Sequence, residues 1–139
     1  MYANIANESM KKAEIIYPEL SYGIIGAAFE VFNEEGYGRR EHYYREVLYK
    51  TLRAAGISSI KERLIQWRHK DGTSGRYFVD LLVEDKIVVE IKVKYRMEYV
   101  DIRQVTDYLR AGNYKLAILV YFTKSGVKYR RVLNPFYTE

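Results

Sequence analysis

Apolar residues recur along this chain with two periods, and the period predicts where helices and strands lie. Spacings of three and four residues indicate helices, whereas alternation or short apolar runs indicate strands. Ser21 is the expected N-cap of the first helix. The pattern predicts helices over residues 21–36, 40–55 and 99–111, and strands over 63–69, 76–83, 87–93, 116–122 and 127–133. The last strand, 127–133, is expected to lie nearer an edge of the sheet than strand 116–122, which is wholly apolar. This order predicts an α/β (α+β) domain with a sheet flanked by helices.

Three charged residues interrupt the apolar strands in the middle of the chain. Asp80, Glu90 and Lys92 stand among Val, Ile, Leu and Phe, although charged residues are depleted in strands and are rarely buried alone. Side chains two positions apart share a face of a strand, so Glu90 and Lys92 project together while the apolar residues between them project to the other face. One face is therefore expected to carry chemistry and the other to form core.

The turn between these two strands decides how the charged groups meet. A three-residue loop over residues 84–86 would place Asp80 opposite Glu90, whereas a slip of one residue would turn Asp80 to the other face. Two interpretations of the resulting patch remain. It is an oxygen-ligand site for Mg²⁺ or Mn²⁺, or it is a cross-strand salt bridge between Lys92 and either carboxylate on a solvated face.

Composition narrows the kind of site and the kind of protein. The 139 residues include no Cys and only two histidines, His42 and His69, so a metal would be held by oxygen ligands. The net charge of +5 favours a polyanionic partner. No stretch approaches the length of a membrane span, and the first residues lack the apolar core of a signal peptide. We therefore expect a cytoplasmic protein that does not contact membranes.

Few structural signals mark the beginning of the chain. Residues 1–18 end at Tyr17-Pro18 and are expected to be a flexible N-terminal segment. Residues 19–139 contain no repeat, linker or low-complexity tract and are expected to form a single domain.

Two motifs carry a resemblance to a known family. Asp80 followed by Glu90-Ile91-Lys92 resembles the D…(D/E)XK signature of the PD-(D/E)XK nuclease superfamily, with Val79 at the position of the proline. Residues 38–44, GRREHYY, resemble the GxxExxY pattern for which one small family of that superfamily is named. The similarity extends from about residue 19 to residue 133, and the joint occurrence of both motifs in order makes it specific. It implies a restriction-endonuclease-like core, a central mixed sheet with a three-stranded antiparallel meander.

The resemblance also implies roles for individual residues. It assigns Asp80, Glu90 and the main-chain carbonyl of Ile91 as ligands of Mg²⁺, with Mn²⁺ as a substitute, and Lys92 as the residue that positions or activates the attacking water. Glu41 matches an additional acidic residue near the metal, and its alternative role is a favourable charge at a helix N-terminus.

Gln104 and Tyr108 lie four residues apart on one face of a predicted helix and match the QxxxY motif of several nucleases in the superfamily. They would orient the phosphate backbone. Before Glu41 the sequence departs from the usual family pattern, because basic residues stand where apolar ones are expected. A phosphate-binding rim is predicted, against the alternative of a solvated face, from Arg39, Arg40, Lys94, Arg96 and Arg103.

The resemblance and these residues together predict a metal-dependent nuclease, with DNA as the expected substrate. It would hydrolyse phosphodiester bonds by attack of a metal-activated water. Two alternatives from other classes are a nucleic-acid-binding module that does not cut and a dimeric regulatory protein in which the carboxylates form salt bridges. A homodimer would also be required for cutting both strands, because that takes two sites.

Overall fold

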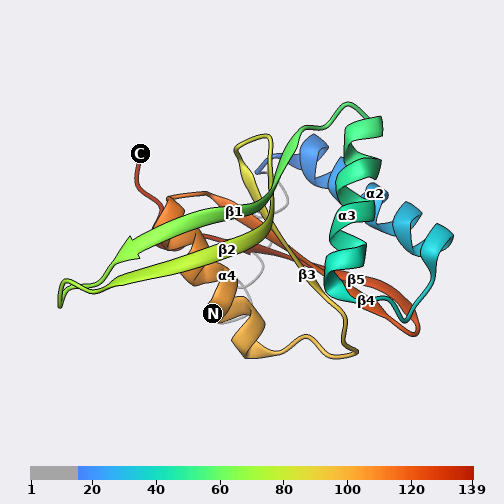
Figure 1. The fold of residues 1–139 in the computed structure, drawn as a ribbon. Helices are drawn as coiled ribbons and strands as arrows, with labels where there is room; N and C mark the ends of the chain where they lie inside the picture. The colour runs from blue at the N-terminus through green and yellow to red at the C-terminus, as the bar shows by residue number, and fades with distance from the viewer. Residues whose placement is uncertain (1–15) are drawn as a thin grey trace, which may run out of the picture.

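The computed structural model describes residues 16–139, and residues 1–15 lie outside the described part. The element order α, α, β, β, β, α, β, β is confirmed (Figure 1). The elements are α2 (Pro18–Glu35), α3 (Glu41–Ala54), β1 (Ser59–Arg68), β2 (Ser74–Val83), β3 (Ile87–Lys92), α4 (Tyr99–Gly112), β4 (Leu116–Thr123) and β5 (Gly126–Leu133). The N-terminal segment expected over residues 1–18 falls mostly outside the described residues and stays a prediction, as does the domain expected over 19–139.

Helix α2 begins before the N-cap expected from the sequence. Tyr17 occupies the N-cap and Pro18 the first turn, where the fixed φ of proline suits a helix and its missing N–H has no partner to lose. Ser21 lies inside the helix, is fully buried and donates its N–H to the Tyr17 carbonyl at 2.9 Å. The N-cap prediction for Ser21 was therefore wrong, because the proline starts the helix one turn earlier.

The five strands form one sheet in the order β1-β2-β3-β4-β5. Neighbouring strands are antiparallel except β3 and β4, which are parallel and are joined by α4. The meander of β1, β2 and β3 is confirmed, and so are the buried β4 and the edge position of β5. Strand β1 starts at Ser59, four residues earlier than expected, because Ser59 pairs with Val83.

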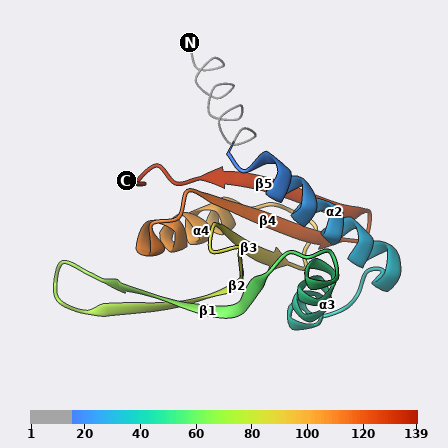
Figure 2. The ribbon, with the colours of Figure 1, turned by 90° about the horizontal axis from the view of Figure 1, so that it is seen from above.

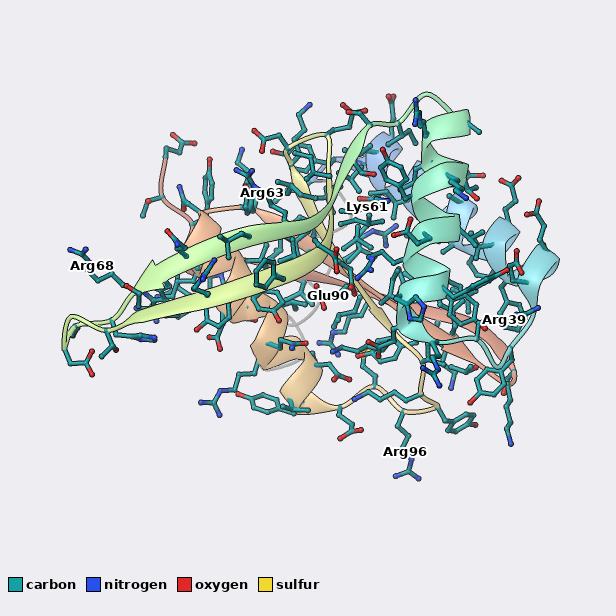
Figure 3. All side chains as sticks on the ribbon, viewed as in Figure 1. Arg39, Lys61, Arg63, Arg68, Glu90 and Arg96 are labelled. Atoms are coloured by element: carbon teal, nitrogen blue, oxygen red, sulfur yellow. The ribbon has the colours of Figure 1, made fainter. Side chains whose placement is uncertain are left out.

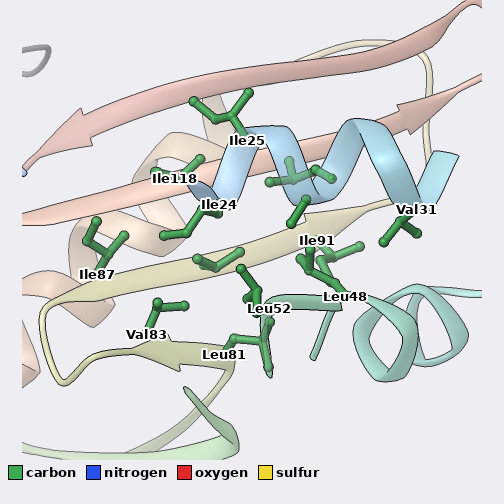
Figure 4. Packing of buried hydrophobic residues seen from close by; sticks show 14 of the residues in the cluster. Ile24, Ile25, Val31, Leu48, Leu52, Leu81, Val83, Ile87, Ile91 and Ile118 are labelled. Carbon is green, nitrogen blue, oxygen red and sulfur yellow. The ribbon is translucent and has the colours of Figure 1, made fainter. Parts of the chain in front are cut away.

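Helices cover both faces of the sheet. Helices α2 and α3 pack on one face through an apolar cluster that includes Ile24, Leu48 and Ile91 (Figure 4). Helix α4 packs on the other face through Val105 and Leu109. Figures 1 and 2 show α4 toward one end of the sheet and the α2–α3 pair toward the other. None of the helices in the described residues is long and apolar enough to cross a membrane.

Strands β1 and β2 run on as a two-stranded ribbon beyond the rest of the sheet. Their pairing continues from Leu64↔Phe78 to Arg68↔Ser74, and the turn at the far end reaches past α4 (Figures 1 and 2). We call residues 64–78 the arm.

Candidate active site

The turn between β2 and β3 has the three residues expected. Val83 pairs with Ile87 across a loop of residues 84–86, whose first two residues adopt left-handed φ angles of 52° and 56°. This loop sets the register in which Asp80 stands opposite Glu90, so the predicted register is confirmed.

Backbone pairing of β2 and β3 ends where the two carboxylates meet. Leu81 and Val89 are the last backbone pair. One step further, the Asp80 N–H donates to Glu90 Oε1 at 2.8 Å, and the Ile91 N–H donates to Asp80 Oδ2 at 2.8 Å. Side-chain oxygens thus take the place of main-chain carbonyls as acceptors. Both carboxylates are fixed where β2 and β3 separate, and we call this point the strand fork.

The protein offsets the charge of these carboxylates only in part. Glu90 is 5% exposed, and its burial, followed by the charge of Asp80, raises the pKa of Glu90 to about 8. Burial also raises the pKa of Asp80, with a further contribution from the charge of Glu41. The cations Arg45 and Lys92 oppose that rise without cancelling it. A divalent cation would supply the missing positive charge.

Helix α4 contributes a positioning group beside the carboxylates. The Lys92 ammonium donates to Gln104 Oε1 at 2.7 Å, so the residue of the (D/E)XK motif and the glutamine of the QxxxY motif are in contact. Within residues 16–139, no ion pair of Lys92 with either carboxylate is found, and the cross-strand salt bridge considered from the sequence is not observed. Burial raises the pKa of Tyr108, and the charges of Glu90 and Asp80 raise it further. The Tyr108 phenol therefore remains protonated and able to donate.

Sequence reasoning missed Arg45. Its Nη1 lies 3.7 Å from Asp80 Oδ1 and 3.2 Å from Glu62 Oε1, and its side chain is only 16% exposed. Arg45 follows Glu41 by four residues on α3, which places both on one helix face and was the available signal.

Glu62 holds an unusual backbone conformation next to this site. It lies between the pairs Lys61↔Leu81 and Arg63↔Val79, opposite Asp80, and its φ is +51°. A non-glycine residue in this region costs on the order of 1–3 kcal/mol and persists where the surroundings enforce it. Val79 and Leu81 would share a face in a regular strand, but Leu81 packs in the α2–α3 cluster and Val79 in the α4 cluster. The β1–β2 ribbon therefore changes its facing, that is, which of its faces is turned toward α4, at this position.

The tyrosine of the GxxExxY pattern anchors the start of α3. Tyr44 is fully buried, and its ring stacks on Phe122 with centroids 4.1 Å apart. Its hydroxyl donates to the Gly36 carbonyl at 2.6 Å and accepts the Arg39 N–H at 3.3 Å. This arrangement fixes the loop before Glu41, the exposed first residue of α3.

Residues of the predicted phosphate-binding rim differ in availability. Lys94 donates to Asp101 Oδ1 at 2.7 Å and to Glu98 Oε1 at 3.1 Å, so its charge is already paired. Arg39 lies over the Tyr43 ring at 5.1 Å. Arg96 extends outward from the loop before α4 (Figure 3). The exposed members are Arg39, Arg40, Arg96 and Arg103.

The donor set at the fork fits a hard divalent cation. Asp80 Oδ1 and Glu90 Oε2 accept no hydrogen bond from the described residues, and carboxylate and main-chain oxygens, including the carbonyl of Ile91, are the ligands that Mg²⁺ prefers. No group of three or more acidic or histidine side chains within residues 16–139 is placed to hold a metal. Glu41 therefore stays a predicted ligand, and water and substrate would complete the coordination.

Comparison with known proteins identifies the fold and the family. The crystal structure of SSO0001 is 19% identical in sequence and superposes with a TM-score of 0.57, covering 76% of this chain and 57% of that one. The mixed sheet flanked by three helices is a restriction-endonuclease-like fold, as expected. The family model described as the PD-(D/E)XK nuclease superfamily matches residues 18–132, and the chain belongs to this superfamily. A search of curated proteins gave no match.

Proposed function

We propose that this protein is a metal-dependent nuclease that hydrolyses phosphodiester bonds, with DNA as its substrate, and that it belongs to the GxxExxY group of its superfamily. One observation carries the proposal: the N–H groups of Asp80 and Ile91 hold the Glu90 and Asp80 carboxylates together at the strand fork. Burial, followed by the charge of Asp80, raises the pKa of Glu90 to about 8. Perturbed carboxylates of this kind cluster at functional sites.

Asp80, Glu90 and the Ile91 carbonyl would hold Mg²⁺, or Mn²⁺ in its place. A divalent ion at such a site lowers the pKa of water and neutralises charge on the phosphate. Glu41, at the start of α3, adds a negative charge that acts on both carboxylates.

Lys92 is proposed to stabilise negative charge on the phosphate. An ammonium has three donors, and Gln104 accepts one of them at 2.7 Å, which leaves two for a phosphate oxygen or the attacking water. Gln104 thus orients Lys92, and the protonated Tyr108 hydroxyl is a further donor on the same face of α4.

The GxxExxY assignment is supported by what Tyr44 does. Its contacts to Gly36 and Arg39 connect the helix to the preceding loop, so the motif tyrosine determines where Glu41 and Arg45 emerge. The motif glycine, Gly38, lies in the loop between these two contacts, and its φ is +108°. Cutting both strands of a duplex would need a second copy of the chain.

The test is cleavage of supercoiled, linear, branched and single-stranded DNA, and of RNA, in Mg²⁺, Mn²⁺ or EDTA. Lys92→Ala is expected to lower the cleavage rate by about 30-fold to 1,000-fold, by analogy with lost oxyanion donors, while Mn²⁺ binding persists. Lys124→Ala, an exposed lysine in the β4–β5 turn, is the matched control. Undiminished cutting by Lys92→Ala would remove Lys92 from the mechanism, and nucleic-acid binding without cutting in any metal would favour the non-catalytic module.

A further inference from the structure

The arm has two unlike faces. On one face, Ile65 and Tyr77 pack in the α4 cluster. On the same face, the Arg110 guanidinium of α4 lies over the Trp67 ring, 4.7 Å from the ring centroid. Because side chains alternate along a strand, the intervening residues point away from α4. This outer face is made of Leu64, Gln66, Arg68, Ser74, Arg76 and Phe78.

The outer face is basic and uncovered. Arg68 and Arg76 are exposed, and Phe78 keeps 57% of its surface exposed, which is unusual for a phenylalanine in a strand. Asp71 is the only acidic residue between positions 64 and 78, and its carboxylate accepts the N–H and the hydroxyl of Thr73 at 2.9 and 2.7 Å. Within residues 16–139, neither Arg68 nor Arg76 forms an ion pair, so the arm presents positive charge on this face.

The outer face leads directly into the candidate active site. Ser74, Arg76 and Phe78 alternate along β2, and Asp80 follows Phe78 by two residues, at the position where the ribbon changes its facing. The six residue steps from Ser74 to Asp80 span about 20 Å at about 3.3 Å per step, which equals the rise of about six base pairs at roughly 3.4 Å each. A nucleic acid cut at Asp80 could thus run along the whole arm.

One groove on the opposite side of the site is mainly acidic. A surface groove of about 560 Å³ between α2 and α3 is lined by four glutamates, Glu30, Glu34, Glu35 and Glu46, together with His42 and Lys50. Figures 1 and 2 place these helices at the end of the molecule away from the arm. This groove is therefore a less favourable place for a polyanion than the arm.

We propose that the outer face of the arm binds a DNA duplex on one side of the cleavage point, with Arg68 and Arg76 contacting phosphates. The proposal rests on the proposed nuclease function. A duplex is the occupant because a two-stranded β-ribbon fits the major groove and because two closely spaced arginines match the dense phosphate charge of a double helix.

The experiment measures binding separately from cutting. Fluorescence anisotropy with a labelled 20-base-pair DNA duplex, and with single-stranded DNA and RNA of the same sequence, in Ca²⁺, compares the full chain with Arg68→Gln/Arg76→Gln and with Phe78→Ala. The matched control is Arg53→Gln/Lys124→Gln, which removes the same charge from exposed positions away from the arm. Circular dichroism checks folding. We expect the arm variant to bind about tenfold or more weakly and its salt slope to fall by about 2, one for each lost phosphate contact, while the control stays within about twofold.

Each outcome is decisive. Equal binding by the arm variant and the control would overturn the arm proposal and leave the nuclease proposal standing. Failure of the unmodified protein to bind any DNA or RNA would overturn both. A loss of binding that is confined to single-stranded DNA and also occurs in Phe78→Ala would show that the arm binds a single strand, with bases stacked on Phe78, and not a duplex. Loss of duplex binding in the arm variant supports the proposal even if no cutting is detected.

Discussion

Two carboxylates in this protein are almost equally buried and yet behave in opposite ways. Glu90 is 5% exposed and Asp101 is 3% exposed. The pKa of Glu90 is raised to about 8. Burial acts on Asp101 in the same direction, but hydrogen bonds from Lys94, Tyr121 and the Glu98 backbone outweigh it, and the pKa of Asp101 is lowered.

The difference lies in how deep each carboxylate lies beneath the surface and in the donors that it receives. Asp101 accepts the Lys94 ammonium at 2.7 Å, the Tyr121 hydroxyl at 2.8 Å and the Glu98 N–H at 3.1 Å. Glu90 accepts one backbone N–H and faces Asp80. Burial alone therefore does not mark a functional acid, because a fully satisfied carboxylate such as Asp101 stabilises the fold.

The largest expected contrast is in metal binding and cleavage. Glu90→Gln should remove Mn²⁺-dependent stabilisation and reduce cleavage by at least about a hundredfold, because a ligand is lost and metal catalysis is worth several kcal/mol. Asp101→Asn, the matched buried control, should keep both. Thermal unfolding with and without Mn²⁺ and initial cleavage rates measure the contrast. A similar loss of metal response in both variants would show that the two acids do not differ as described.

The second contrast is in the pH dependence of stability in EDTA. Because the pKa of Glu90 is higher in the folded protein than its ordinary 4.5, the folded state holds the proton longer. The free energy of unfolding should therefore fall as pH rises from about 4.5 to about 8, by about 1.4 kcal/mol for each unit of pKa shift. Asp101 acts in the opposite direction, and its contribution is lost as pH falls below 3.8.

Urea unfolding across pH 4 to 9 checks this second contrast. Glu90→Gln should flatten the decline between pH 4.5 and 8 and be more stable than the unmodified protein at pH 8. A decline that survives unchanged in Glu90→Gln would assign the titration to another group.

The third effect is the loss of stability at neutral pH in Asp101→Asn. The substitution removes the charge that Lys94 pairs with, and hydrogen bonds to charged groups contribute about 1.5–3 kcal/mol. We expect a destabilisation of about 2–3 kcal/mol in urea unfolding, of opposite sign to Glu90→Gln in EDTA at the same pH. Tyr121→Phe should give a smaller loss of about 1 kcal/mol, and an unchanged stability in both variants would contradict the structural role.

The smallest effect concerns the cation beside the site. Arg45→Met removes a positive charge 3.7 Å from Asp80 Oδ1, so Mn²⁺ should bind about threefold to tenfold more tightly, given the attenuated Coulomb energies near a protein surface. Titration calorimetry measures the affinity, with the exposed Arg53→Met on the same helix as control. Weaker Mn²⁺ binding in Arg45→Met would mean that Arg45 organises Asp80 instead of competing with the metal.

Local rules were enough to predict the central pair of the site. The length of the 84–86 loop and the alternation of side chains determine that Asp80 meets Glu90, and both are readable from the sequence. The i, i+4 spacing of Gln104 and Tyr108 likewise predicted one helix face, and the contact of Gln104 with Lys92 agrees with it.

Groups brought by tertiary packing were not predictable in this way. Arg45 reaches Asp80 only because α3 packs across the end of β2, and Lys94 is withdrawn from the predicted rim by Asp101, seven residues later. The start of β1 at Ser59 also escaped prediction, because β1 carries few apolar residues before Leu64 and its start depends on pairing with β2.

At the strand fork, carboxylate oxygens accept the hydrogen bonds that main-chain carbonyls would otherwise accept. Two backbone amides of the site can therefore serve as spectroscopic probes. The Asp80 N–H donates a hydrogen bond to the Glu90 carboxylate, and the Ile91 N–H donates one to the Asp80 carboxylate. Any change in the charge or position of either carboxylate must alter the chemical shift and the exchange rate of one of these two amides. Nuclear magnetic resonance of these two backbone amides in the nitrogen-15-labelled protein would thus follow ligand entry and proton release at the site without a substrate or an attached reporter group.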